Sequence, residues 1–183
     1  MSHEALVRTG QALSIRYDAT GDDVFWSPLP MFHIAAIFPI CAMYSVGATY
    51  VGMARFEAGE ALQLLEQNRV TMAYPSFGTF IGDMIYHPAF PTTDLSRIRV
   101  MNSNLAMQPD SFREALRKAL PNCIQVGTYG MTETSGTVST SRLTDDYRTR
   151  TLRLGHPLPG LEMRIVREDG TDAAPDEIGE IAV

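Results

Sequence analysis

The sequence predicts an α/β fold, a layered parallel sheet with helices on both faces, followed by an antiparallel hairpin that belongs to a second sheet. Two observations predict it. Short apolar runs alternate with segments of helical periodicity through the first part of the chain, which is typical of a covered parallel sheet. After Ser141 a period-two pattern replaces this alternation. We therefore expect an α/β subdomain over 1–141 and the start of a β-rich subdomain over 142–183.

The first third of the chain predicts two helices and two strands. Ser2 fits the N-cap of a helix that runs to about Ile15, and a loop rich in Asp and Gly separates this helix from a strand at 24–27. A largely apolar helix over 34–46 follows and ends at a glycine. The next β-rich run, 48–51, predicts the second strand.

The middle of the chain repeats this unit. Apolar residues at 58, 61, 62 and 65 have the i, i+3, i+4, i+7 spacing of an amphipathic helix, and 77–85 has the same spacing. A third helix over 109–120 begins at a proline, carries Arg and Lys in its last turn and ends before another proline. The remaining strands are predicted at 71–74, 98–101 and 123–126.

The C-terminal segment predicts a hairpin. Residues 161–165 alternate between apolar and polar side chains, Asp169-Gly170 forms a turn signal, and 179–183 has the composition of the partner strand. The last strand runs to the end of the sequence, so we expect the chain to be a piece of a longer protein.

Composition excludes several functional classes. The chain has 183 residues, of which 45% are hydrophobic, so it can bury a sizeable core. Its net charge of -6 argues against nucleic-acid binding, and no apolar run reaches the roughly 18 residues of a membrane span. The N-terminus lacks the apolar segment of a signal peptide. Cys41 and Cys123 both lie in apolar surroundings, so we expect reduced cysteines and a cytoplasmic location.

The strongest chemical signal is the segment 127–136, which follows the predicted strand 123–126. It combines three glycines, several hydroxyl side chains and one carboxylate, Glu133. Glycine permits close approach of the backbone to a ligand, hydroxyl and N–H groups bind phosphate oxygens, and a carboxylate beside them can hold Mg²⁺. We therefore predict a phosphate-binding loop at the carboxyl end of the fifth strand. The alternative is an ordinary turn between two elements.

Four separated motifs resemble those of the adenylate-forming enzymes, which include acyl-CoA synthetases, adenylation domains of peptide synthetases and luciferases. The resemblance extends from Ser2 to Val183, and the four motifs are specific because they occur in the family's order and spacing. They are Pro28-Leu29-Pro30-Met31-Phe32-His33, Tyr129-Gly130-Met131-Thr132-Glu133, Gly155-His156-Pro157-Leu158-Pro159-Gly160 and Gly179-Glu180-Ile181.

The resemblance implies a two-step reaction. A carboxylate attacks the α-phosphorus of Mg²⁺-bound ATP to give an acyl-adenylate and pyrophosphate, and a thiol, usually that of coenzyme A, then takes the acyl group. The implied partners are therefore ATP or AMP, Mg²⁺, coenzyme A and a small carboxylic acid. The aromatic and aliphatic residues after Pro75, such as Phe77 and Phe80, would suit an apolar acid. The sequence does not indicate an oligomeric state.

The resemblance also implies roles for individual residues. Tyr129 would pack against adenine, Thr132 would bind phosphate and Glu133 would coordinate Mg²⁺, while His33 would lie between the acid pocket and the thiol channel. For an arbitrary protein, these residues would instead be a buried histidine, a core tyrosine and a capping glutamate. The implied catalytic residues are Thr132, Glu133 and His33. The implied nucleotide-binding residues are Ser103, Asn104, Leu105, Gly127, Thr128, Tyr129, Gly130, Met131 and Thr132.

The sequence departs from the family pattern at two places in the nucleotide pocket. Ser103-Asn104-Leu105 replaces a usual Gly-Gly-Ala, and Gly127-Thr128 replaces a usual Gln or Asn followed by Gly. The family's phosphate loop, ribose-binding aspartate and catalytic lysine are absent from the chain, so we expect it to be inactive alone. Two other functions stay open: an adenylating enzyme that loads a carrier protein, and a non-catalytic nucleotide-binding or interaction module.

Overall fold

The computed structural model describes residues 1–183, and its centre is a five-stranded parallel sheet. The strand order is β2-β1-β3-β4-β5, with every neighbouring pair parallel. The predicted parallel sheet is therefore confirmed. Its strands are β1 (Val24–Ser27), β2 (Thr49–Gly52), β3 (Met72–Ala73), β4 (Val100–Asn102) and β5 (Ile124–Val126).

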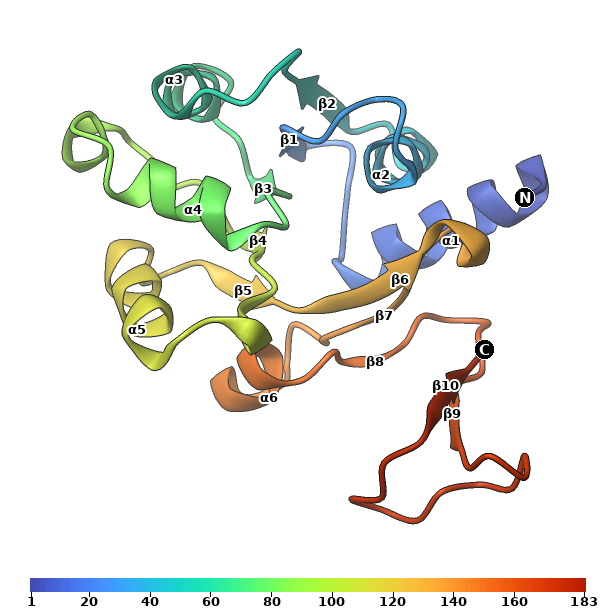
Figure 1. The fold of residues 1–183 in the computed structure, drawn as a ribbon. Helices are drawn as coiled ribbons and strands as arrows, with labels where there is room; N and C mark the ends of the chain where they lie inside the picture. Colours follow the sequence, from blue (N-terminus) through green and yellow to red (C-terminus); the bar gives the residue numbers. More distant parts are fainter.

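Helices cover both faces of the sheet, as predicted (Figure 1). One face packs on α1 and α2, and the other packs on α3, α4 and α5. Successive strand residues point to opposite faces, so Phe25 joins the core with α1 and α2 while Trp26 joins the other core. The five helices are α1 (His3–Arg16), α2 (Ile34–Ser45), α3 (Ala58–Gln67), α4 (Gly78–Ile85) and α5 (Asp110–Ala119).

Local signals position several helix ends as the sequence indicates. The Ser2 hydroxyl accepts a hydrogen bond from the Ala5 N–H at 3.1 Å and caps α1. Arg117 and Lys118 occupy the last turn of α5, where cations complement the helix dipole. Pro39 lies inside α2, where it removes one helical hydrogen bond, and it is buried. Short 3₁₀ turns occur at η1 (Phe90–Thr92) and η2 (Leu105–Met107).

The segment after β5 is not a loop, contrary to our prediction. It forms an antiparallel hairpin of β6 (Thr128–Met131) and β7 (Gly136–Thr140), joined by the 3₁₀ turn η3 (Thr132–Thr134). The glycines of this segment are also typical of turns, which is why the sequence predicted a loop. In the structure Gly130 instead allows β6 and β7 to approach closely. A Cβ there would lie 2.7 Å from the Gly136 carbonyl carbon and closer still to its oxygen.

Two further elements lie beyond β7. A short helix, α6 (Tyr147–Leu152), is capped by Asp146, and β8 (His156–Pro157) adds to β7 to complete a three-stranded antiparallel sheet. Neither was predicted. The predicted C-terminal hairpin is confirmed as β9 (Arg164–Val166) and β10 (Glu180–Ala182), which form their own two-stranded sheet at the edge of the molecule (Figure 1). The domain boundary after position 141 stays a prediction.

Candidate functional site

The strand order places a crevice at one point of the sheet. The chain moves outward from β1 to β2 and then returns to the other side of β1 for β3, so the order reverses between β1 and β3. Ligands of open α/β sheets bind at such a reversal, beyond the carboxyl ends of the strands. The segments that leave β1 and β3 diverge here and contribute His33 and Tyr74, respectively, to one cavity.

We call this cavity of about 220 Å³ the switch-point cavity. Its walls come from the start of α2, the segment between β3 and α4, the loop after β4, and the β6–β7 hairpin. Five predicted site residues meet here although they come from three separate segments. They are His33, Asn104, Thr128, Gly130 and Met131.

His33 is exposed and occupies the N-cap of α2. Its Nδ1 accepts a hydrogen bond from the Ala35 N–H at 3.1 Å, so the hydrogen of a neutral His33 ring lies on Nε2. Nε2 makes no protein hydrogen bond. The helix cap therefore orients the ring and leaves one nitrogen available at the rim of the cavity. The alternative of a buried histidine is wrong.

Asn104 replaces a glycine of the family pattern and keeps a backbone shape typical of glycine. Its φ of 43° and ψ of 52° are left-handed, a conformation that asparagine tolerates better than most residues. Its Oδ1 accepts hydrogen bonds from the Thr128 N–H at 2.7 Å and from the Thr128 hydroxyl at 3.3 Å. The side chain thus joins the end of β4 to the start of β6.

The two neighbours of Asn104 lie deeper. Ser103 is buried, and its hydroxyl has no hydrogen-bond partner. Leu105 is buried in the core beneath α3, α4 and α5. Neither residue lines the switch-point cavity. Their predicted role in adenine binding stays a prediction.

The remaining predicted residues lie along β5, β6 and η3. Gly127 is buried and Tyr129 is half-buried, and neither lines the cavity. Thr132 and Glu133 lie on η3 and are exposed. The Glu133 carboxylate makes no hydrogen bond or ion pair with the protein, and no group of three or more His, Cys, Asp or Glu side chains could hold a metal ion. Glu133 is therefore a single, unengaged carboxylate next to the cavity rim.

Sequence reasoning missed the base of the cavity. Phe38, Tyr74 and Thr137 are all buried there, and the Tyr74 and Thr137 hydroxyl oxygens are 3.2 Å apart. No local motif marks these residues. Tyr74 follows β3 and precedes a proline, whereas Thr137 belongs to β7, so only the tertiary packing of the two sheets brings them together.

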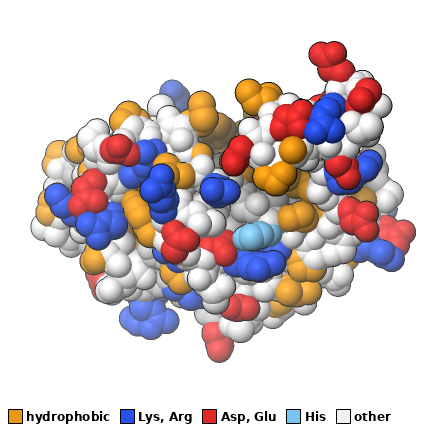
Figure 2. Space-filling view, turned by 90° about the horizontal axis from the view of Figure 1, so that it is seen from below, with side chains coloured by type: hydrophobic (Ala, Val, Ile, Leu, Met, Phe, Trp, Pro, Cys, Tyr) orange, Lys and Arg blue, Asp and Glu red, His pale blue; other side chains and the backbone are white.

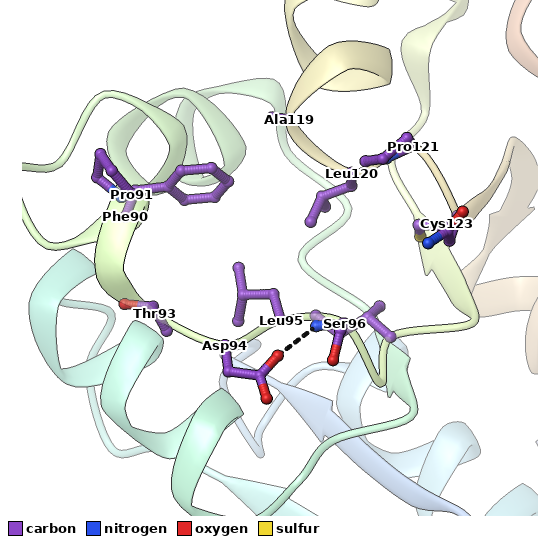
Figure 3. A pocket seen from close by; sticks show the side chains of 12 residues that line it. Phe90, Pro91, Thr93, Asp94, Leu95, Ser96, Ala119, Leu120, Pro121 and Cys123 are labelled. Carbon is purple, nitrogen blue, oxygen red and sulfur yellow. Dashed lines mark hydrogen bonds between the residues drawn. The ribbon is translucent and has the colours of Figure 1, made fainter.

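A larger cavity of about 410 Å³ lies at the opposite end of β4 and β5, between the loop after η1 and the end of α5 (Figure 3). It contains none of the predicted site residues. Among its polar groups, Asp94 accepts a hydrogen bond from the Ser96 N–H at 3.0 Å and so closes a local turn. Burial raises the pKa of the Cys123 thiol to about 12, which keeps this thiol neutral. We assign no function to this cavity.

The Cys123 thiol is expected to react with a disulfide reagent at pH 8 roughly a thousandfold more slowly than an ordinary cysteine, because its thiolate is that much rarer. Absorbance after addition of dithionitrobenzoate to a Cys41→Ser variant measures this rate. The same variant in guanidinium chloride is the control and should react rapidly. Fast modification of the folded variant would contradict the raised pKa of the thiol.

The surface shows no gathering of one charge on the face seen in Figure 2, where acidic and basic side chains are interspersed. This agrees with the modest net charge of -6. None of the helices combines the length and the hydropathy that crossing a bilayer requires.

Comparison with known proteins identifies the family. The AMP-binding enzyme family matches residues 1–183. The chain is 30% identical over 169 residues to an indoleacetate–CoA ligase of Aromatoleum aromaticum, an alignment that covers 91% of this chain and 32% of that protein. It is 32% identical over 168 residues to 4-coumarate–CoA ligase 4 of Arabidopsis thaliana, which covers 90% of this chain and 29% of that protein. The chain thus spans about a third of the length of these relatives.

Solved structures show the same fold. A long-chain-fatty-acid–CoA ligase of Archaeoglobus fulgidus superposes with a TM-score of 0.86 at 21% identity, covering 99% of this chain and 38% of that one. The O-succinylbenzoate coenzyme A synthetase of Bacillus subtilis, solved in complex with AMP, superposes with a TM-score of 0.79 at 23% identity, covering 98% and 44%. With a family match over its entire length and the parallel-sheet architecture of these ligases, the chain belongs to the AMP-binding enzyme family.

Proposed function

We propose that this chain forms the acid- and nucleotide-binding part of an ATP-dependent carboxylic acid:CoA ligase. The observation that supports it most directly is the switch-point cavity, where His33 and the end of β6 meet. In the first step a carboxylate oxygen bonds to the α-phosphorus of ATP and pyrophosphate leaves. In the second step the thiol of coenzyme A attacks the acyl carbon and AMP leaves.

Each residue at or near the cavity has a role in this proposal. The Tyr129 ring packs against adenine, and the Thr132 hydroxyl donates a hydrogen bond to a phosphate oxygen. The His33 Nε2 faces the acid and the incoming thiol. The backbone around Asn104 and Gly130 shapes the edge of the nucleotide site. These positions hold the reacting groups in line, which is the main task of a phosphoryl-transfer site.

A magnesium ion fits the donor set of this site. Nucleotide-bound Mg²⁺ takes most of its ligands from phosphates and water and needs only one or two carboxylates. Glu133 is exposed, and its carboxylate is free of protein partners. When bound, the ion would neutralise charge on the phosphates. Glu133 would hold it, and Thr132 would bind the adjacent phosphate oxygen.

The names of the relatives support an apolar acid. Indoleacetate and 4-coumarate each carry a carboxyl group on a ring-bearing skeleton, and these are the acids named for two proteins at 30% and 32% identity. The walls of the switch-point cavity include Ile34, Phe38 and Phe77. An acid with an apolar skeleton would bury its surface against these side chains.

The proposal predicts that Mg²⁺ lowers the Kd of the chain for ATP. In Glu133→Gln the factor by which Mg²⁺ lowers this Kd should be about tenfold smaller, because the variant loses an anionic metal ligand. Isothermal titration calorimetry with ATP, with and without MgCl₂, measures both quantities. Glu168→Gln is a matched control because Glu168 lies on the β9–β10 hairpin segment, outside the site. Equal Mg²⁺ dependence in the wild type and in Glu133→Gln would exclude the metal role.

A non-catalytic nucleotide-binding module is the second candidate function. One observation favours it: the Asn104 side chain, which replaces a glycine of the family's nucleotide pocket, accepts hydrogen bonds from the Thr128 N–H at 2.7 Å and the Thr128 hydroxyl at 3.3 Å. Both candidates predict that the 183-residue chain alone catalyses no ATP–pyrophosphate exchange. They differ in that only a ligase part binds an acyl-adenylate analogue more tightly than AMP.

A further inference from the structure

The switch-point cavity has an exposed rim and a buried base. His33, Phe77 and Met131 are exposed at the rim, whereas Tyr74 and Thr137 are only 3% and 4% exposed. The nucleotide-binding segment that we propose, β6 and η3, adjoins the rim. An acid must keep its carboxylate beside the nucleotide. The other end of the acid therefore points to the base.

The base carries hydroxyl groups, whereas Ile34, Phe38 and Phe77 form the apolar part of the wall. The Tyr74 and Thr137 hydroxyl oxygens are 3.2 Å apart and share a hydrogen bond, and the Tyr74 hydroxyl also interacts with Thr128 and Asn102. Thr128 stands beside them in the wall and accepts a hydrogen bond from the Asn102 amide at 3.1 Å. The Oδ1 atom of Asn102 has no partner, but Asn102 does not line the cavity. A wall that presents hydroxyl groups disfavours an entirely apolar occupant, because such an occupant displaces water from these groups without replacing its hydrogen bonds.

The size and shape of the cavity limit the acid. Its volume of about 220 Å³ is below the roughly 300–1,000 Å³ typical of pockets for larger ligands. The Phe38 ring meets the Tyr74 ring edge-on, with centroids 6.1 Å apart, and lies against Gly136, where a Cβ would be 2.7 Å from the Phe38 ring. Packed aromatic rings therefore form part of the far wall. A long alkyl chain has no exit through it.

We propose that the site selects a compact acid that carries a hydrogen-bonding group, such as a phenolic hydroxyl, at the end remote from its carboxylate. The remote group exchanges hydrogen bonds with Tyr74 and Thr137. The ring or short chain between the two ends packs on Ile34 and Phe38. This specificity rests on the function proposed above, since it assumes that an acid occupies the cavity.

The test uses non-hydrolysable acyl-adenylate analogues, 5′-O-(N-acylsulfamoyl)adenosines, that carry 4-hydroxyphenylacetyl, phenylacetyl or decanoyl groups. Calorimetry with the 183-residue chain measures their affinities. We expect the hydroxyphenylacetyl probe to bind about three- to tenfold more tightly than the phenylacetyl probe, the effect of one hydrogen bond. The decanoyl probe is expected to bind more weakly than both.

Variants locate the source of this preference. Tyr74→Phe and Thr137→Val should each reduce the preference for the hydroxylated probe, whereas Thr137→Ser, which keeps a hydroxyl, should retain it. Tyr44→Phe is the control because Tyr44 is exposed on α2 and does not line the cavity. The preference for the hydroxylated probe is measured first in the wild-type chain, so a variant that fails to fold does not prevent the test.

The outcomes separate the two proposals. Equal binding of the two aromatic probes, or tighter binding of the decanoyl probe, overturns the specificity but leaves the ligase function standing. Binding of all three probes no tighter than that of AMP overturns the ligase function and the specificity with it. A preference that persists in both Tyr74→Phe and Thr137→Val overturns the assignment to these hydroxyls.

Discussion

Replacing Gly130 with alanine is expected to lower the stability of the protein by about 3 kcal/mol, among the largest effects of any single alanine substitution. The added methyl group would lie 2.7 Å from the Gly136 carbonyl carbon and 2.7 Å from the Thr137 Cα. Both contacts are with backbone atoms, which cannot rotate away as a side chain would. The β6–β7 pairing must therefore open, and the wall of the switch-point cavity would open with it.

Thermal denaturation followed by circular dichroism measures this effect, and we expect a midpoint roughly 6–12 °C below that of the wild type. Gly82→Ala is the matched control. Its Cβ would meet only the Phe112 ring at 3.5 Å, an ordinary contact, and alanine favours the helix in which Gly82 lies. A Gly130→Ala variant that melts with the wild type would show that β6 and β7 are not in the close register described above.

Replacing Asp23 with alanine is expected to cost about 2–3 kcal/mol, because Arg99 and Thr71 lose a buried carboxylate to which both donate hydrogen bonds. Arg99 donates hydrogen bonds to Asp23 at 2.8 and 3.0 Å and to the carbonyl oxygens of Tyr17 and Asp18, each at 3.0 Å. The Thr71 hydroxyl donates a further bond to Asp23 at 2.6 Å. One carboxylate thus joins the end of α1 to β1, β3 and β4.

The same carboxylate makes stability depend on acid pH. Burial alone would raise the pKa of Asp23, but hydrogen bonds from Arg99, Thr71 and the Thr20 N–H outweigh burial and lower the pKa below its ordinary 3.8. A lowered folded-state pKa contributes stability that is present above pH 3.8 and is lost as pH falls through the folded-state value.

Urea denaturation at pH 7 and at pH 3 tests both points. The difference in unfolding free energy between the wild type and Asp23→Ala should shrink at pH 3. Asp22→Ala, at the exposed neighbouring position, is the control and should behave like the wild type at both pH values. A constant difference across this range would contradict the lowered pKa of Asp23.

Much of the fold could be predicted because its elements have local causes. The Ser2 cap, the apolar spacing of α3 and the apolar runs of β1 to β5 are each legible within a few residues. The β6–β7 hairpin could not be predicted in this way, since Thr and Gly also compose turns and only the pairing of Gly130 with β7 explains them. The helix α6 is short and polar and depends on its Asp146 cap.

Some residues of the candidate site could likewise be predicted from the sequence, and others could not. His33 and Thr128 to Glu133 belong to contiguous motifs, so the sequence alone could nominate them. Tyr74 and Thr137 are 63 positions apart, and Tyr74 follows β3 of the parallel sheet while Thr137 belongs to β7 of the antiparallel sheet. Their proximity is a property of the tertiary structure. The consequence of replacing the family's glycine by Asn104 also required the backbone, which shows that the left-handed conformation is retained.

The wall of the switch-point cavity combines segments that follow strands of the parallel sheet with the antiparallel β6–β7 hairpin, and side-chain hydrogen bonds such as Asn104 to Thr128 and Tyr74 to Thr137 join the two parts. A molecule that fills the cavity contacts both parts at once. Part of its binding free energy therefore stabilises the contact between the parallel sheet and the antiparallel sheet of β6, β7 and β8. By thermodynamic reciprocity, whatever shifts the angle between these layers also tunes affinity for the occupant, even from a residue that never touches it.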